Sequence, residues 1–176
     1  GHSSTSISAA LGFAEAAKQQ KLGHKAVALI GDGSLTGGLA FEGLNNAGAA
    51  KTDILVILND NNISIDRNIG AIHEYLLNIT TDPRYNKAKK HIWDKLGDGR
   101  FRKLIQKMVV GTKSYLVRHS GGDLFEAMGF RYFGPIDGND IEQVIRTLQK
   151  LKELGGPLIL HTLTTKGKGY APAEAN

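Results

Sequence analysis

Two groups of oxygen-bearing side chains, set twenty-seven residues apart, have the types that bind a divalent cation. Asp32, in the run Gly31-Asp32-Gly33, can supply a charged carboxylate oxygen, and Asn61 can supply a neutral amide oxygen. The backbone carbonyl of Ile63 can add a third oxygen. Mg²⁺ takes about six oxygen ligands and usually draws only a few of them from protein. The spacing therefore predicts a magnesium site at Asp32, Asn61 and Ile63.

The residues around Asp32 also suit a phosphate group. Gly31 and Gly33 let the backbone turn tightly beside an anion. Ser34 opens the next predicted helix, where unpaired N–H groups and the positive end of the helix dipole favour negative charge. A Gly-Asp-Gly turn alone is common between strands and helices. Its pairing with Asn61 after the following strand favours a metal-bridged diphosphate over a plain turn.

Both groups follow short apolar runs that predict strands buried on both faces. These runs are Ala26 to Ile30 and Ile54 to Leu58, and residues 35–49 between them have a helical pattern. A strand, helix and strand in this order imply a right-handed crossover and a parallel sheet. The sequence therefore predicts an α/β fold, with a parallel sheet flanked by helices and both groups at its carboxyl edge.

The rest of the chain continues this alternation. Ser3, Ser4 or Thr5 can cap a helix that Gly23 ends, and Gly134-Pro135 predicts a turn. Residues 80–120 predict a flexible or irregular insertion within a single domain, 1–176. Further elements are expected as helices at 3–20, 71–79, 101–117, 123–128 and 140–154, and as strands at 132–133 and 157–163.

Composition excludes several classes of protein. The 176 residues contain no cysteine, so disulfides and thiolate metal sites are ruled out and a cytoplasmic location is expected. We expect no membrane span and no signal peptide. Between Arg84 and Arg118, eleven Lys or Arg face two Asp. A nucleic-acid patch and a solvated connecting segment both fit this cluster, and the scarcity of aromatic residues favours the solvated segment, with no nucleic-acid partner.

Five blocks, taken in order, resemble one family of thiamine-diphosphate enzymes. The Gly31-Asp32-Gly33 and Asn61-Asn62 pair is similar to the signature of transketolases, decarboxylases and 2-oxo-acid dehydrogenases. The whole set resembles the 1-deoxy-D-xylulose-5-phosphate synthase family and its diphosphate-binding domain. Its blocks are Gly1–Ser8, Gly31–Gly38, Ile57–Asn61, Gly134–Gly138 and Thr165–Glu174. Asn139 departs from the family pattern, in which a histidine is common at that position.

The resemblance implies which residues bind the cofactor. Asp32, Asn61 and Ile63 would hold Mg²⁺, and the activating glutamate would lie outside this chain. Gly1-His2-Ser3, which opens a helix, is also a plausible anion cradle in its own right. Contacts to thiamine diphosphate are implied for Gly1, His2, Ser3, Gly33, Ser34, Asn61, Lys166 and Tyr170.

The family's reaction is the implied function. It is a transferase reaction that condenses pyruvate with D-glyceraldehyde 3-phosphate, giving 1-deoxy-D-xylulose 5-phosphate and CO₂ for isoprenoid, thiamine and pyridoxal precursors. Because the chain begins with Gly1 and not with Met, we expect it to start inside a longer protein. Relative to the family we expect it to be incomplete at both ends, and inactive alone because the activating glutamate would lie outside it. Its expected partners are the pyrimidine-binding domain and a second subunit of a homodimer. Two alternatives are a subunit of a split transketolase-like enzyme and a non-catalytic binding module.

Overall fold

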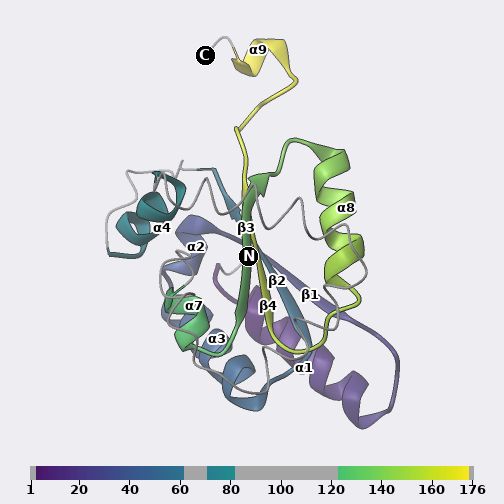
Figure 1. The fold of residues 1–176 in the computed structure, drawn as a ribbon. Helices are drawn as coiled ribbons and strands as arrows, with labels where there is room; N and C mark the ends of the chain where they lie inside the picture. The colour runs from purple at the N-terminus through teal and green to yellow at the C-terminus, as the bar shows by residue number, and fades with distance from the viewer. Residues whose placement is uncertain (1–2, 62–70, 82–122, 175–176) are drawn as a thin grey trace.

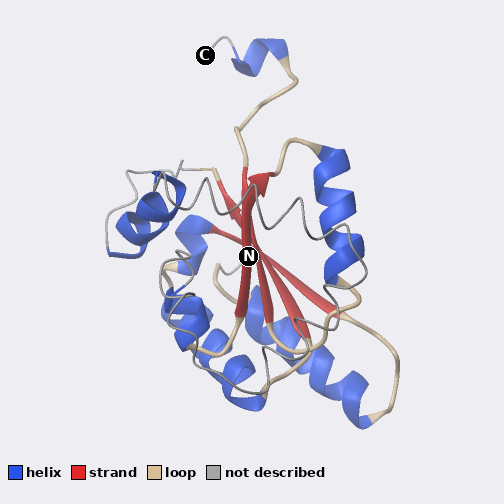
Figure 2. Ribbon diagram, viewed as in Figure 1, coloured by secondary structure: helices blue, strands red, loops and turns tan. Residues whose placement is uncertain are grey.

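The computed structural model describes residues 3–61, 71–81 and 123–174, which form an α/β fold around one parallel sheet. The strands are β1 (Ala26–Gly31), β2 (Ile54–Asp60), β3 (Arg131–Asp137) and β4 (Leu158–Leu163), in the spatial order β1-β2-β4-β3. Figure 2 shows the strands at the centre with helices around them. The predicted fold class is confirmed. Of the segment predicted to be irregular, residues 82–120 lie outside the described residues, as does the predicted helix at 101–117.

Helices cover both faces of this sheet. Those of the larger core, including α3 and α7, lie on one face, and α8 lies on the other (Figure 1). In the described part of the chain, no helix is long and apolar enough to cross a membrane. The helices are α1 (Ser6–Gln19), α2 (Asp32–Leu35), α3 (Gly38–Ala50), α4 (Ala71–Thr81), α7 (Asp123–Ala127), α8 (Ile141–Leu151) and α9 (Ala171–Glu174).

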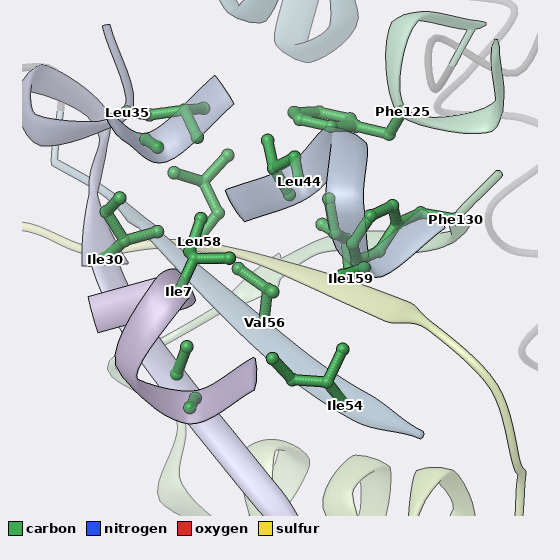
Figure 3. Close-up of a cluster of buried hydrophobic side chains, with 14 of the residues drawn as sticks. Ile7, Ile30, Leu35, Leu44, Ile54, Val56, Leu58, Phe125, Phe130 and Ile159 are labelled. Carbon is green, nitrogen blue, oxygen red and sulfur yellow. The ribbon is translucent and has the colours of Figure 1, made fainter. Parts of the chain in front are cut away.

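Two apolar clusters hold the layers together. The larger one joins α1 and α3 to the sheet through side chains such as Ile7, Leu44 and Val56 (Figure 3). The smaller one lies under α8 and includes Leu151 and Leu160. Burying each such side chain contributes about 1.5–3 kcal/mol. The clusters therefore fix the strands, and with them the loops at the carboxyl edge.

The prediction that β1 is buried on both faces is wrong. Ala28 and Ile30 lie in the core, but Val27 is 53% exposed and Leu29 is 64% exposed. β1 is an edge of the described sheet, and the cluster under α8 draws on β2, β3 and β4 rather than on β1. By contrast, β4 lies between two strands and is buried along almost its whole length.

The helix predicted for residues 35–49 is divided into α2 and α3 at Gly37. Gly37 is extended, with φ −74° and ψ 142°, and it packs directly on Ser4. A Cβ at position 37 would overlap the Ser4 side chain, so only glycine allows this approach. The predicted end of the first helix is also corrected: α1 ends at Gln19, and Lys21 rather than Gly23 takes the left-handed conformation.

The N-terminal caps of α1 and α8 differ. Thr5 precedes α1 without a side-chain cap bond, so the predicted capping is not made there. Asp140 caps α8, because its Oδ1 accepts from the Gln143 N–H at 3.0 Å. Gly134-Pro135 lies inside β3 instead of forming the predicted turn, and the register with β4 shifts there. An edge strand tolerates proline, which cannot donate to a ladder.

Candidate functional site

The carboxyl ends of β1 and β2 bring the two predicted groups to one edge of the sheet. Asp32 directly follows β1, and Asn61 directly follows β2. The two strands pair in parallel up to Gly31 and Asn59, so both groups leave the sheet at the same level. The prediction that they share an edge is confirmed.

Asp32 is a buried carboxyl with a second carboxyl nearby. Its residue is 6% exposed, and Asp60, the last residue of β2, is 7% exposed. Burial, followed by the charge of Asp60, raises the pKa of the Asp32 carboxyl above its usual value, while the backbone N–H of Gly33 acts in the opposite direction. Two adjacent buried carboxylates repel each other, and a divalent cation would offset that repulsion.

The start of α1 is tied to the loop that carries Asp32. The Ser4 hydroxyl donates to the Ser34 carbonyl at 2.7 Å, and Ser4 has a positive φ of 68°. Gly33 and Ser34 form the middle of α2, which begins at Asp32 itself. Ser3 is exposed beside this junction. The structure therefore brings Ser3, Gly33 and Ser34 into one region, next to Asp32.

The other predicted site residues are placed as follows. Lys166 and Tyr170 lie after β4, and Tyr170 is 65% exposed. The segment that carries them leads away from the sheet to α9, which stands apart beyond the carboxyl edge (Figure 1). Gly1, His2 and Ile63 fall outside the described residues. The metal and cofactor contacts expected of all these residues therefore remain predictions.

Asn139 holds the beginning of the segment that carries Lys166. Its Oδ1 accepts from the Thr165 N–H at 2.7 Å, and its own N–H donates to Asp137 Oδ1 at 2.9 Å. Gly138 donates to the Leu163 carbonyl at 2.7 Å alongside. The residue that departs from the family pattern thus has a clear local role, which is to dock the loop after β3 against the end of β4.

Replacing Asn139 with Ala should loosen this docking. The Thr165 N–H loses its acceptor, and a net hydrogen-bond contribution of about 1 kcal/mol corresponds to roughly fivefold faster amide exchange. Hydrogen-exchange mass spectrometry over residues 163–170 measures this rate. Asn139→Asp keeps an acceptor oxygen and should exchange like the parent. Unchanged exchange in Asn139→Ala would show that the bond does not hold the segment.

Sequence reasoning missed a buried polar chain that ends at Asp60. His161 is 0% exposed, and its Nε2 lies 3.0 Å from Asp60 Oδ2. The Tyr132 hydroxyl lies 2.6 Å from Nδ1 of the same ring. One signal was available, since a histidine inside the apolar run of residues 157–163 must find polar partners when it is buried. The identity of those partners depends on strands far apart in the chain.

Few protein ligands are on hand for a metal in this region. Across residues 3–61, 71–81 and 123–174, no group of three or more His, Cys, Asp and Glu side chains is arranged to hold an ion. Such a group is typical of zinc sites, whereas Mg²⁺ takes oxygen ligands and usually keeps several that do not come from the protein. The region offers a buried carboxylate at Asp32 and the amide oxygen of Asn61, which directly follows Asp60. Both are oxygen ligands of the kind that Mg²⁺ takes.

Comparison with known proteins identifies the family of this chain. Residues 1–164 match the family described as 1-deoxy-D-xylulose-5-phosphate synthase. The chain is 49% identical over 179 residues to 1-deoxy-D-xylulose-5-phosphate synthase of Cytophaga hutchinsonii, covering 99% of this chain and 28% of that protein. The enzyme of the same name from Chlorobaculum tepidum is 46% identical over 182 residues, covering 100% of this chain and 28% of that protein.

A solved structure shows the same fold. Transketolase from Campylobacter jejuni superimposes with a TM-score of 0.53 at 22% identity, over 95% of this chain and 20% of that one. The chain spans about 28% of the length of the curated relatives named above. The family match and the identity to these relatives, over nearly the whole chain, lead to one conclusion: the chain belongs to the 1-deoxy-D-xylulose-5-phosphate synthase family.

Proposed function

We propose that this chain supplies the metal- and diphosphate-binding part of a 1-deoxy-D-xylulose-5-phosphate synthase, a transferase that uses thiamine diphosphate and Mg²⁺. Its substrates would be pyruvate and D-glyceraldehyde 3-phosphate, and its products 1-deoxy-D-xylulose 5-phosphate and CO₂. The observation that carries the proposal is the buried Asp32 carboxyl at the end of β1, beside Asp60 at the end of β2, in a chain of this family.

The residues at this edge fit a cation that bridges a diphosphate. The Asp32 carboxyl is buried near a like charge, which favours a bound cation over an isolated carboxylate. Asn61 directly follows Asp60 at the end of β2 and offers a neutral amide oxygen. Gly33 and Ser34 present a backbone without bulk next to Asp32, where phosphate oxygens would meet the cation. The donor set is oxygen only, as Mg²⁺ requires.

In this proposal, thiamine diphosphate supplies the electron sink for the chemistry, and the chain's own residues anchor and orient it. Asp32, Asn61 and the Ile63 carbonyl would hold the cation. Lys166 and Tyr170 would close over the cofactor from the end of β4, which requires the segment beyond Thr165 to fold back toward Asp32. The cofactor's other contacts would come from Gly1, His2, Ser3, Gly33 and Ser34.

The remaining functions would belong to the rest of the protein. The pyrimidine-binding domain would supply the activating glutamate and the substrate-phosphate contacts, and the assembled enzyme would be a cytoplasmic homodimer. We therefore expect the 176-residue chain alone to release no CO₂ from pyruvate.

Calorimetric titration of thiamine diphosphate into the full-length gene product tests the binding part of the proposal. Binding should require Mg²⁺ and disappear in EDTA, because the cation links the diphosphate to Asp32. Thiamine without its diphosphate should not bind detectably. Formation of 1-deoxy-D-xylulose 5-phosphate from the two substrates tests the reaction. Metal-independent cofactor binding, or no binding at all, would refute the assignment.

A further inference from the structure

A chain of three polar side chains runs through the protein interior to the edge where Asp32 lies. Tyr132 on β3, His161 on β4 and Asp60 on β2 belong to three neighbouring strands. The Tyr132 hydroxyl lies 2.6 Å from His161 Nδ1, and His161 Nε2 lies 3.0 Å from Asp60 Oδ2. His161 is 0% exposed and Asp60 is 7% exposed, so solvent scarcely reaches the bond between these two residues, whereas Tyr132 is partly buried.

The direction of these hydrogen bonds follows from the chemistry of the groups. An ionised carboxylate can only accept, so His161 Nε2 must carry a hydrogen and donate it to Asp60. In a neutral ring Nδ1 then accepts, and the Tyr132 hydroxyl donates to it. Both bonds therefore point toward Asp60. The carboxylate receives a buried charge-assisted hydrogen bond that restrains the position of Oδ2.

Aromatic packing holds the Tyr132 end of the polar chain in place. The Tyr132 ring stacks on Phe125 with centroids 5.7 Å apart and planes 3° apart, and Phe125 is 1% exposed. Tyr75 packs edge-on against Phe125, and its hydroxyl accepts from the Leu124 N–H at 3.0 Å. Tyr132 is thus positioned by α4 and α7, and it orients the His161 ring in turn.

The Asp60 end of the polar chain lies next to the proposed metal site. Gly31 of β1 pairs with Asn59 of β2, so Asp32 and Asp60 are the next residues along two adjacent parallel strands, and both are buried. In keeping with this placement, the charge of Asp60 adds to burial in raising the pKa of Asp32. Asp60 also directly precedes Asn61, and its carbonyl accepts from the Thr164 N–H at 2.9 Å. A shift of Asp60 would therefore move the adjacent Asn61 and change the electrostatic environment of Asp32.

We propose that His161 and Tyr132 are positioning residues that hold the Asp60 carboxylate beside Asp32, so that the site presents two negative charges to a divalent cation. This inference rests on the proposed function, since it concerns the same cation. His161 and Tyr132 act only through Asp60. A divalent cation binds more tightly to such a pair than to one carboxylate, and outer partners of this kind are worth about 10- to 100-fold in metal affinity.

The test is the Mg²⁺ affinity of the full-length gene product, measured by calorimetry with thiamine diphosphate present. His161→Leu removes both hydrogen bonds, and Asp60→Asn removes the charge but keeps an acceptor. Each should weaken Mg²⁺ binding by about 10- to 100-fold. His161→Leu in the Asp60→Asn background should add little further loss, because the two residues act as one unit. His161→Gln, which can still donate toward Asp60, should recover much of the affinity.

Thr162→Val is the matched control. Thr162 is the next residue on β4, and its buried hydroxyl donates to the Leu58 carbonyl at 3.1 Å. It should lower the melting temperature without changing the Mg²⁺ affinity. If His161→Leu does not fold, Tyr132→Phe keeps the imidazole and should show a smaller loss in the same direction.

The outcomes separate this inference from the proposed function. If the parent binds Mg²⁺ and Asp32→Asn does not, the metal site stands. Unchanged Mg²⁺ affinity in His161→Leu, or in Tyr132→Phe where that is the variant used, would then overturn the positioning role alone. Fully additive losses in the double variant would also overturn it. A parent that shows no Mg²⁺-dependent binding would refute both proposals.

Discussion

Replacing Asp32 with Asn is expected to abolish magnesium-dependent binding of thiamine diphosphate without lowering the stability of the metal-free protein. The variant loses the only charged ligand in the predicted set of Asp32, Asn61 and Ile63. Loss of outer partners alone costs about 10- to 100-fold in metal affinity, so removal of a direct ligand should exceed about 100-fold. Calorimetry with and without Mg²⁺ measures the change.

The stability half of this prediction follows from burial. Asp32 is 6% exposed and lies near the charge of Asp60, so the carboxylate is costly to keep in the absence of a cation. The amide removes that repulsion at nearly constant volume. In EDTA, denaturant unfolding of Asp32→Asn should therefore match or exceed the parent in free energy of unfolding.

Asp53→Asn is the matched control. Asp53 directly precedes β2, at the opposite edge of the sheet, and forms an ion pair with Lys25 at 2.5 Å. The two side chains of this ion pair are about half exposed, so loss of the pair should have little effect on stability and none on cofactor binding. If Asp32→Asn bound thiamine diphosphate with the Mg²⁺-dependent affinity of the parent, the cation would not bind at this edge of the sheet.

Replacing Gly48 with Ala should strongly destabilise the fold, although Gly48 lies inside α3. Helix propensity alone favours alanine by about 1 kcal/mol. The new Cβ, however, would overlap the Met128 carbonyl oxygen and lie 2.9 Å from the Met128 carbonyl carbon. These are backbone atoms that cannot rotate away. Overpacking of this kind costs about 1–3 kcal/mol, and the shift would extend to Phe125 and Phe130 in the core.

Gly12→Ala makes the same change in α1 with the opposite expected result. Gly12 is exposed, and its Cβ would meet nothing within 4 Å. The substitution should stabilise by about 0.4–1 kcal/mol. Guanidinium unfolding of the two variants side by side measures the contrast. If Gly48→Ala were also stabilising, the close approach of α3 to residues 128–129 would be wrong.

The carboxyl edge was predictable because the signals for it are local. The apolar runs before Gly31 and Asn59 indicate strands, and one helix-length segment between them implies a parallel pair. The oxygen-bearing side chains then follow the strand ends directly. Neither step requires knowledge of distant contacts, which is why the site region and the fold class were predicted together.

Features that depend on distant contacts were not predictable. The run at β1 indicates burial but not whether a layer covers both faces, so Val27 and Leu29 were misjudged. The division of the helix at Gly37 results from the approach of Ser4, which lies elsewhere in the chain. The polar chain joins Asp60 to His161, 101 residues later, and His161 to Tyr132, 29 residues earlier. A sequence pattern does not show which residues pair across strands that are so far apart in the sequence.

The position of β4 has a consequence for synthesis on the ribosome. β4 follows β3 in the sequence, yet it lies between β2 and β3, and in the described sheet β3 pairs with β4 alone. Translation proceeds at about 5–20 residues per second, so a nascent chain that already contains Asp32 and Asp60 waits seconds for residues 158–163. During that interval Asp60 has no His161, and the two halves of the sheet have no strand to join them. Until β4 emerges, the edges of β2 and β3 with which it pairs stay open, and such edges are prone to aggregation.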